Sequence, residues 1–142
     1  MTDPSRLWRE TRTVSSSILD SSCWIEYFNG TPLGERFAAL IEEMDGLLVP
    51  SICIAEVYRH ALRHRGADDA LVVLGGMVLF PIVDLDPNIA KLAAELGIEH
   101  SLPLADSIIY ATARSHDATL LTLDSDLAGL PGVELMSRDA LD

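Results

Sequence analysis

The feature that most constrains the fold is an alternation of short apolar segments with longer segments of helical character. The short segments are rich in Val, Ile and Leu and lack the polar alternation of a strand that faces water, which is typical of strands buried on both faces. The pattern therefore predicts an α/β protein, a three-layer α/β/α sandwich around a parallel sheet of about five strands. We expect strands over residues 14–20, 46–50, 80–85, 119–123 and 133–136.

Capping residues and breakers set the expected ends of the helices. Thr31-Pro32 and Asp86-Pro87 each place an N-cap residue before a proline at the first helical position. Ser51 is suited to cap the next helix, and Gly75-Gly76 to end one. Pro81 cannot donate to a ladder, so its strand belongs at a sheet edge. We expect helices over residues 23–28, 33–44, 51–66, 67–74, 86–97 and 105–116.

The length of 142 residues fits one domain with a single core. Residues 1–16 carry arginines and serines without an apolar segment, so we expect a flexible N-terminal leader followed by one domain over residues 17–142. The longest uncharged segment, residues 70–83, is shorter than a membrane span and contains glycine and proline, so we expect no transmembrane helix and no membrane partner. Cys23 and Cys53 have no zinc or disulfide spacing and indicate buried thiols in a reducing, cytoplasmic compartment.

Acidic residues follow the predicted strands at the end where open α/β sheets bind their ligands. Asp20 closes the first strand, and Glu56 lies one turn into the helix after the second. Asp106 is in the first turn of the helix before the fourth strand, and Asp124 and Asp126 come directly after that strand. We therefore expect all five carboxylates at one rim of the sheet.

Each acid also has a structural explanation when it is taken alone. Asp106 suits a helix N-terminus, and Asp124 and Asp126 suit a turn or an N-cap. Glu56 and Asp20 are harder to explain in this way, because both stand among apolar neighbours where an unpaired charge is costly. Carboxylates in one pocket repel each other unless a cation neutralises them, and oxygen ligands without paired His or Cys favour Mg²⁺ or Mn²⁺ over Zn²⁺. Such a site suits phosphodiester hydrolysis.

The formal charge of −12 disfavours nucleic acid unless the basic residues are clustered. Arg59, His60 and Arg63 fall at i+3, i+4 and i+7 from Glu56, on one face of the helix predicted over residues 51–66. This face is a candidate RNA-binding surface beside the carboxylates. The simpler explanation is a solvated helix face with intrahelical Glu–Arg pairs.

Four segments of the chain resemble, in order, the signature segments of PIN-domain nucleases, and most closely those of the VapC-type toxins. The final segment, which runs on through Pro131-Gly132-Val133, is the most specific. The segments are Ile18-Leu19-Asp20-Ser21-Ser22, Ser51-Ile52-Cys53-Ile54-Ala55-Glu56-Val57, Leu104-Ala105-Asp106-Ser107-Ile108-Ile109-Tyr110-Ala111-Thr112-Ala113 and Leu121-Thr122-Leu123-Asp124-Ser125-Asp126-Leu127-Ala128-Gly129-Leu130.

The resemblance implies a sheet in the order 3-2-1-4-5 and Mg²⁺- or Mn²⁺-dependent endoribonuclease activity. It also implies homodimers and a cognate antitoxin, with this chain as the toxin of a type II toxin-antitoxin pair. By position it assigns a catalytic quartet, metal ligands and hydrogen-bonding supports. These are Asp20, Glu56, Asp106 and Asp124 for the quartet, Asp20, Asp106, Asp124 and Asp126 for the metal, and Ser22 and Thr122 for the supports.

An antitoxin is expected to inhibit by placing a cationic side chain against this quartet, and Arg is best suited because its guanidinium can bind carboxylates in a bidentate way. An apolar groove beside the helix over residues 51–66, with Trp24, Phe28 and Ile52 as its neighbours, is expected to hold an amphipathic segment of the partner.

Three other functions compete with this hypothesis. The first is a housekeeping PIN nuclease that processes RNA without an antitoxin. The second is a catalytically inactive PIN-like binding module, which is disfavoured because no acid of the quartet is missing. The third is a phosphoacceptor receiver domain, which would need a Lys after its last strand, whereas Lys91 is the only lysine of the chain.

Overall fold

The computed structural model describes residues 16–43 and 45–136, and these form a five-stranded parallel sheet. Central β1 pairs in parallel with both β2 and β4. The strand order β3-β2-β1-β4-β5 confirms the predicted parallel sheet and its order. The strands are β1 (Ser17–Leu19), β2 (Leu47–Pro50), β3 (Ile82–Val83), β4 (Thr119–Thr122) and β5 (Val133–Leu135).

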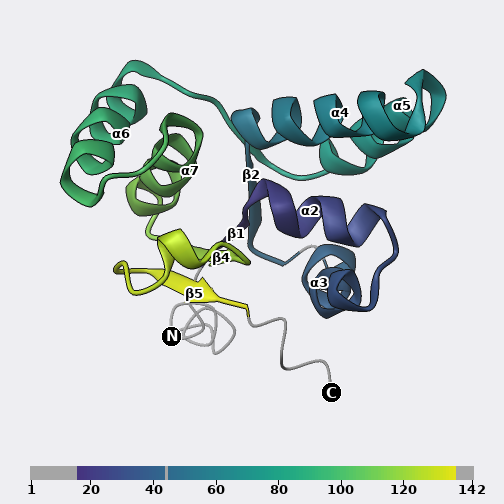
Figure 1. Cartoon of the computed structure of the whole chain (residues 1–142), viewed down its shortest axis with the longest axis horizontal. Coiled ribbons are helices and arrows are strands. Elements are labelled where there is room, and N and C mark those ends of the chain that lie inside the picture. The colour runs from purple at the N-terminus through teal and green to yellow at the C-terminus, as the bar shows by residue number, and fades with distance from the viewer. Residues whose placement is uncertain (1–15, 44, 137–142) are drawn as a thin grey trace, which may run out of the picture.

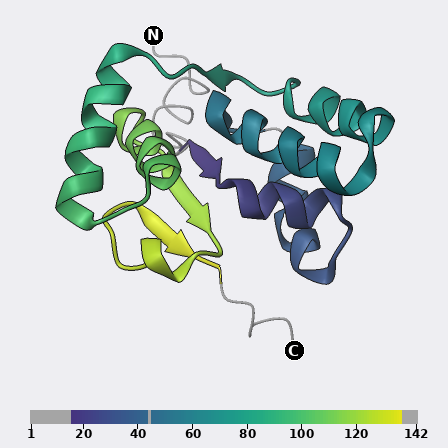
Figure 2. The same ribbon diagram turned by 45° about the horizontal axis from the view of Figure 1, so that its top comes forward.

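Helices flank the sheet on both sides, which confirms the three-layer α/β/α sandwich (Figure 1). The α6 and α7 pair lies at the left of the sheet in Figure 1, and α2 to α5 lie at its right. Helices α2 and α4 run side by side from the ends of β1 and β2 (Figure 2). The helices are α2 (Ser21–Phe28), α3 (Pro32–Glu43), α4 (Ser51–Arg65), α5 (Ala67–Met77), α6 (Pro87–His100), α7 (Leu104–Ser115) and the short 3-10 helix η1 (Ser125–Leu127).

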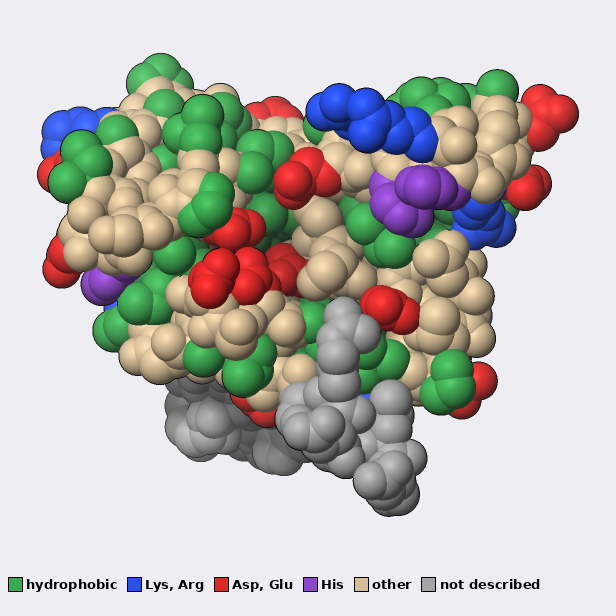
Figure 3. Space-filling model, in the orientation of Figure 1, with side chains coloured by type: hydrophobic (Ala, Val, Ile, Leu, Met, Phe, Trp, Pro, Cys, Tyr) green, Lys and Arg blue, Asp and Glu red, His purple; other side chains and the backbone are tan. Residues whose placement is uncertain are grey.

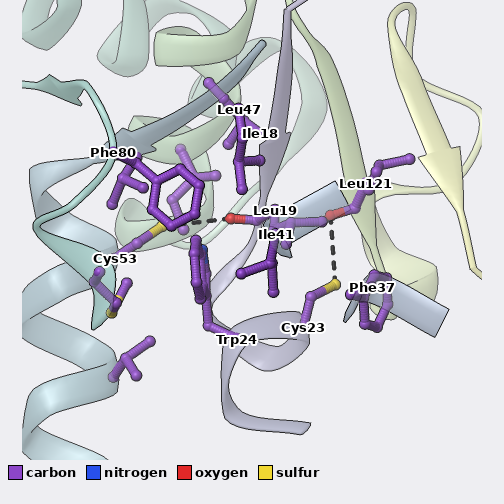
Figure 4. Packing of buried hydrophobic residues seen from close by; sticks show 14 of the residues in the cluster. Ile18, Leu19, Cys23, Trp24, Phe37, Ile41, Leu47, Cys53, Phe80 and Leu121 are labelled. Carbon is purple, nitrogen blue, oxygen red and sulfur yellow. Dashed lines mark hydrogen bonds between the residues drawn. The ribbon is translucent and has the colours of Figure 1, made fainter. Parts of the chain in front are cut away.

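The main core packs the sheet against α2 to α5 and α7 (Figure 4). Ile18 of β1 and Trp24 of α2 are fully buried in it. Both cysteines are free and buried there, as expected, and their thiols donate to backbone carbonyls, Cys23 to Leu121 and Cys53 to Leu19. Burial raises the pKa of both thiols, so they act as small apolar side chains.

Two of the three predicted helix caps are confirmed. Thr31 Oγ1 accepts a hydrogen bond from Gly34 N at 3.0 Å, and Asp86 Oδ1 accepts one from Ile89 N at 2.8 Å. The prediction for Ser51 was wrong, because Ser51 is itself the first helical residue, and α4 starts without a side-chain cap bond. Its Oγ instead accepts from Leu85 N at 3.4 Å, which ties α4 to the segment after β3.

The predicted ends of α5 and α6 were wrong, because the glycines there serve packing. Helix α5 continues through Gly76, where an added Cβ would lie 3.2 Å from the ring of Phe28. Helix α6 continues past Gly97, where a Cβ would lie 2.5 Å from Ser107 Oγ of α7. Ser101 in the left-handed region, with φ 56°, then ends α6.

Strand β3 lies at the sheet edge, as Pro81 predicted, but it is shorter than the expected residues 80–85. The carbonyl of Pro81 accepts a hydrogen bond from Val49 N at 2.9 Å, and Phe80 turns into the core. Residues 1–15 of the predicted leader lie outside the described residues, as do residues 137–142 of the predicted domain. In residues 16–43 and 45–136, no helix is long and apolar enough to cross a membrane.

The close approach of α2 and α3 yields a stability prediction. A Cβ at Gly34 would overlap the backbone carbonyl of Glu26 and lie 2.7 Å from the Cα of Tyr27. We expect Gly34→Ala to lower the free energy of unfolding by about 1–3 kcal/mol, because backbone atoms cannot move aside. Gly75→Ala is the matched control, since a Cβ there meets nothing within 4 Å. In a helix interior, alanine should stabilise by about 0.5–1 kcal/mol.

Urea unfolding of both variants measures the two effects. An equal gain of stability in both would show that helix propensity, and not the contact between α2 and α3, governs these positions.

Candidate active site

Asp20 is held at the junction of β1 and α2 by three donors. It is the N-cap of α2, and its Oδ1 accepts from Cys23 N at 3.1 Å and from Ser22 Oγ at 2.6 Å. Its Oδ2 accepts from Thr122 Oγ1 of β4. The side chain is only 5% exposed, so these donors replace the water that a carboxylate needs. The structure thus brings Asp20 together with both predicted supports.

Thr122 also joins Asp20 to the segment after β4. Its Oγ1 accepts from Asp124 N at 3.0 Å, and Asp124 Oδ1 in turn accepts from Asp126 N at 2.9 Å as the cap of η1. One buried hydroxyl therefore fixes the two acids Asp20 and Asp124 relative to each other. Asp126 is exposed.

Glu56 and Asp106 come from two further helices. Glu56 lies in the second turn of α4, and Asp106 lies in the first turn of α7, as predicted. Ser21 Oγ of α2 donates to Glu56 Oε1 at 2.6 Å and orients this carboxylate. The sequence motifs predicted no role for Ser21. Its position in the first turn of α2, directly after the strand-ending Asp20, was the available signal.

The four acids of the predicted quartet line one open cavity of about 370 Å³. Figure 3 shows acidic side chains gathered around a hollow in this face of the molecule. Asp126 does not line the cavity, and no Lys, Arg or His does so among the described residues. The lining residues are Asp20, Ser21, Ser22, Glu56, Asp106, Ile109, Leu123 and Asp124.

Burial and the negative charges of its neighbours both disfavour ionisation of Asp106. Burial, followed by the charges of Asp124, Asp20, Glu56 and Asp126, raises the pKa of Asp106 to about 6. Asp106 has no donor comparable to those that satisfy Asp20 or Glu56 in the described part of the chain. It therefore carries an ionisation penalty that a bound cation would relieve.

The donor set fits a hard divalent cation. Carboxylate and hydroxyl oxygens line the cavity, and these are the ligands that Mg²⁺ and Mn²⁺ prefer. No three His, Cys, Asp or Glu side chains in residues 16–43 and 45–136 form one coordination sphere as they stand. An ion would therefore be held partly through water, as is usual for Mg²⁺.

The predicted RNA-binding residues lie beside this cavity. Arg59, His60 and Arg63 line a second cavity of about 280 Å³ together with Glu56 and His64. Glu56 thus lines both cavities.

Fold and site together define an α/β domain with an acidic cavity at the carboxyl end of its parallel sheet. A family model of the PIN domain matches residues 17–133, so the chain belongs to the PIN domain family. The resemblance seen in the sequence is confirmed at the level of the family. No curated protein matches the sequence significantly.

Solved structures of toxins share the fold. A toxin-antitoxin complex from Klebsiella pneumoniae superposes with a TM-score of 0.69 at 28% identity, over 84% of this chain and 96% of that one. VapC20 of Mycobacterium tuberculosis, a sarcin-ricin loop cleaving toxin, gives 0.69 at 16% identity over 86% and 100%. DNA-bound VapBC from Salmonella typhimurium gives 0.67 at 19% identity over 85% and 96%.

The bridging hydroxyl of Thr122 yields a second prediction. Thr122→Val keeps the shape of the side chain but leaves Asp20 Oδ2 and Asp124 N without their partner. We expect a loss of about 1–3 kcal/mol in the free energy of unfolding, because buried polar groups become unsatisfied. Thr122→Ser retains the hydroxyl and should recover most of this loss. Equal stability of the valine and serine variants in urea unfolding would contradict the bridge.

The raised pKa of Asp106 yields a third prediction for the metal-free protein. The unfolded carboxyl ionises near pH 3.8 and the folded one only near pH 6, so the stability contributed by this group falls as pH rises between these values. Asp106→Asn removes this ionisation penalty and should raise the free energy of unfolding at pH 8 by about 1 kcal/mol. This value is smaller than the free energy that corresponds to the full pKa shift, because Asp106 is partly exposed and solvent screens its charge. The gain should vanish near pH 4.

Thermal unfolding in EDTA at both pH values measures this difference. Asp84→Asn, a change at an exposed carboxylate that does not line the cavity, is the matched control and should show no such dependence. A destabilised Asp106→Asn at pH 8 would mean that Asp106 acts mainly as a structural residue at the start of α7.

Proposed function

We propose that the protein is a Mg²⁺- or Mn²⁺-dependent endoribonuclease that acts as the toxin of a type II toxin-antitoxin pair. The observation that carries this proposal is the convergence of four carboxylates, Asp20, Glu56, Asp106 and Asp124, on one cavity that no basic side chain of the described residues enters. Membership of the PIN domain family supports a nuclease, and the neighbouring VapC and VapBC structures support a toxin.

The residues of the cavity have two roles in this proposal, which are to bind the cation and to orient the carboxylates. Asp20, Asp106 and Asp124 hold the cation, with Asp126 auxiliary at the rim and Glu56 acting directly or through water. When bound, the cation would supply Lewis-acid chemistry for hydrolysis of a phosphodiester. Ser22 and Thr122 keep the Asp20 carboxylate aimed into the cavity, and Ser21 does the same for Glu56. Hydrolysis then adds water across a P–O bond of RNA and leaves, by resemblance to the family, a 5′-phosphate and a 3′-hydroxyl.

RNA would approach from the side of α4 in this scheme. Arg59, His60 and Arg63 line the second cavity, which shares Glu56 with the acid cavity. The two arginines supply the positive charge that binding to phosphates needs. We further propose that the protein is a homodimer, as the family resemblance implies. We also propose that it is cytoplasmic, which the two free, buried cysteines suit.

The antitoxin would need an apolar surface as well as access to the acids. The groove expected from the sequence was misplaced, because Trp24 is fully buried. An open apolar cavity of about 220 Å³ instead lies between α2, α3 and the end of α5, where Leu79 is 68% exposed. We propose that the antitoxin anchors there and sets an Arg against the quartet. The cavity is lined by Tyr27, Phe28, Ile41, Glu42, Gly76, Leu79 and Phe80.

The fourth prediction concerns the dependence on metal. Purified protein should cleave RNA with Mg²⁺ or Mn²⁺, and excess EDTA should abolish cleavage. Asp106→Asn and Glu56→Gln should each reduce kcat by at least about 100-fold, because loss of a ligand charge weakens metal binding and misplaces the water bound to the metal. Mg²⁺ should raise the melting temperature of the unchanged protein and not that of Asp106→Asn. Full activity in EDTA, in a preparation free of contaminating nuclease, would refute the metal site.

A growth assay distinguishes a toxin from a housekeeping nuclease. Expression of the unchanged protein should arrest growth, Asp106→Asn should not, and coexpression of the short gene next to its own should restore growth. RNA cleavage without growth arrest would favour the housekeeping function. The absence of cleavage under all metals would favour the inactive binding module.

A further inference from the structure

The outer side of helix α5 is apolar although it faces solvent. The helix lies beside α4 and buries Ala70, Val73 and Met77 (Figure 1). Four large apolar side chains on its opposite side are between 47% and 73% exposed, and residues 70–83 carry no charge. A contiguous apolar patch of this kind marks a surface that binds another molecule. The α5 face, as we call it, consists of Leu71, Val72, Gly75, Val78 and Leu79.

Gly75 lies at the centre of the α5 face, and contacts within residues 16–43 and 45–136 do not explain it. Its φ is not positive, and a Cβ there would meet nothing within 4 Å among these residues. By contrast, a Cβ at Gly76 would lie 3.2 Å from the ring of Phe28. A glycine inside a helix destabilises it relative to alanine, so its retention here needs another reason. A helix position without a side chain allows a second backbone to approach closely.

The α5 face is symmetrical about Gly75. Leu71 and Leu79 lie four residues before and after this glycine, and Val72 and Val78 lie three residues before and after it. Val78 keeps right-handed helical dihedral angles, so helical spacing extends to this residue. A twofold axis at Gly75 would set Leu71 opposite Leu79 of a second, antiparallel copy, and Val72 opposite Val78. The face is therefore self-complementary, as an interface between identical chains requires.

Charge also favours a second copy in the antiparallel direction. Two chains of charge −12 repel each other, so they associate most readily through a surface without charge. Antiparallel packing sets the positive N-terminus of each helix dipole near the negative C-terminus of the other. It also separates Asp68, in the first turn of α5, from the same residue of the second copy by about 20 Å along the axis. Salt largely screens repulsion at that distance.

We propose that two copies of this chain associate by antiparallel packing of α5 on α5 across Gly75. The inference goes beyond the proposed nuclease, because none of the five residues of the α5 face lines the acid cavity. A stable interface buries roughly 800 Å² on each partner, from about 20–30 residues. The α5 face is smaller, so the association is weak and depends on concentration. Leu79 also lines the apolar cavity proposed for the antitoxin, so the antitoxin and the second copy compete for this side chain.

Analytical ultracentrifugation of the full chain over a series of concentrations measures the association. The decisive variant is Gly75→Leu, because the single chain has room for the new side chain, whereas two of them at the axis would hold the helices apart. We expect the association to weaken about tenfold or more, although the variant adds apolar surface. Non-specific adhesion would instead become tighter. Ile98→Ser removes an 85% exposed apolar side chain from α6 and is the matched control, which should associate like the unchanged protein.

Two charged variants test the antiparallel direction. Leu71→Lys and Leu79→Glu should each weaken the association, because each sets a charge against an apolar side chain of the second copy. The two changes together in one chain should restore it, since the axis brings the introduced lysine of each copy beside the introduced glutamate of the other. The two positions are eight residues apart, so they do not form a pair within one helix.

Association of Gly75→Leu as tight as that of the unchanged protein, or tighter, would overturn the proposal. A double variant that associates no better than the single ones would do the same, as would an unchanged chain that stays monomeric at every concentration. Weaker association of Ile98→Ser with no effect of Gly75→Leu would place the interface on α6 instead. The measurements need neither metal nor RNA, so failure of the proposed nuclease would leave this interface standing, and the reverse also holds.

Discussion

The hydrogen bond between Thr122 and Asp20 is the interaction on which the site depends. It joins the carboxyl ends of the neighbouring strands β1 and β4, and Asp20 also caps α2. A buried carboxylate is costly unless donors surround it, so the same three donors that allow the strand to end in an acid also fix its direction. The position of the Asp20 carboxylate in the acidic cavity is therefore fixed by the folding of the central strands.

Sequence patterns predicted the fold wherever one residue had one physical role. Thr31 and Asp86 cap helices, because a short side chain with an oxygen acceptor directly before a proline is well suited to an N-cap. Pro81 lies at a sheet edge because it has no N–H to donate to a second strand. Gly76 and Gly97 led to wrong helix ends, because a glycine can either end a helix or allow a neighbouring side chain to approach closely. Only the tertiary structure shows which neighbour approaches.

The acidic cavity could be predicted because a parallel sheet brings the carboxyl ends of its strands to one edge, which places Asp20 and Asp124 together without further information. The role of Ser21 could not be, because its partner Glu56 lies 35 residues away on another helix. The burial of Trp24 was missed for a similar reason, since α2 turns that side chain toward Phe80, which follows α5. Contacts between helices depend on how each helix is rotated about its axis in the fold, and the spacing of residues along one helix does not specify this rotation.

The short edge strand has a consequence for how the molecule behaves at high concentration. A sheet edge with free backbone groups is a template for pairing with another chain. Here β3 offers two residues, Ile82 and Val83, and the preceding Pro81 has no N–H to donate, so the template is too short to recruit a foreign strand. A chain that is 49% apolar thus has a built-in defence against aggregation by strand addition at this edge.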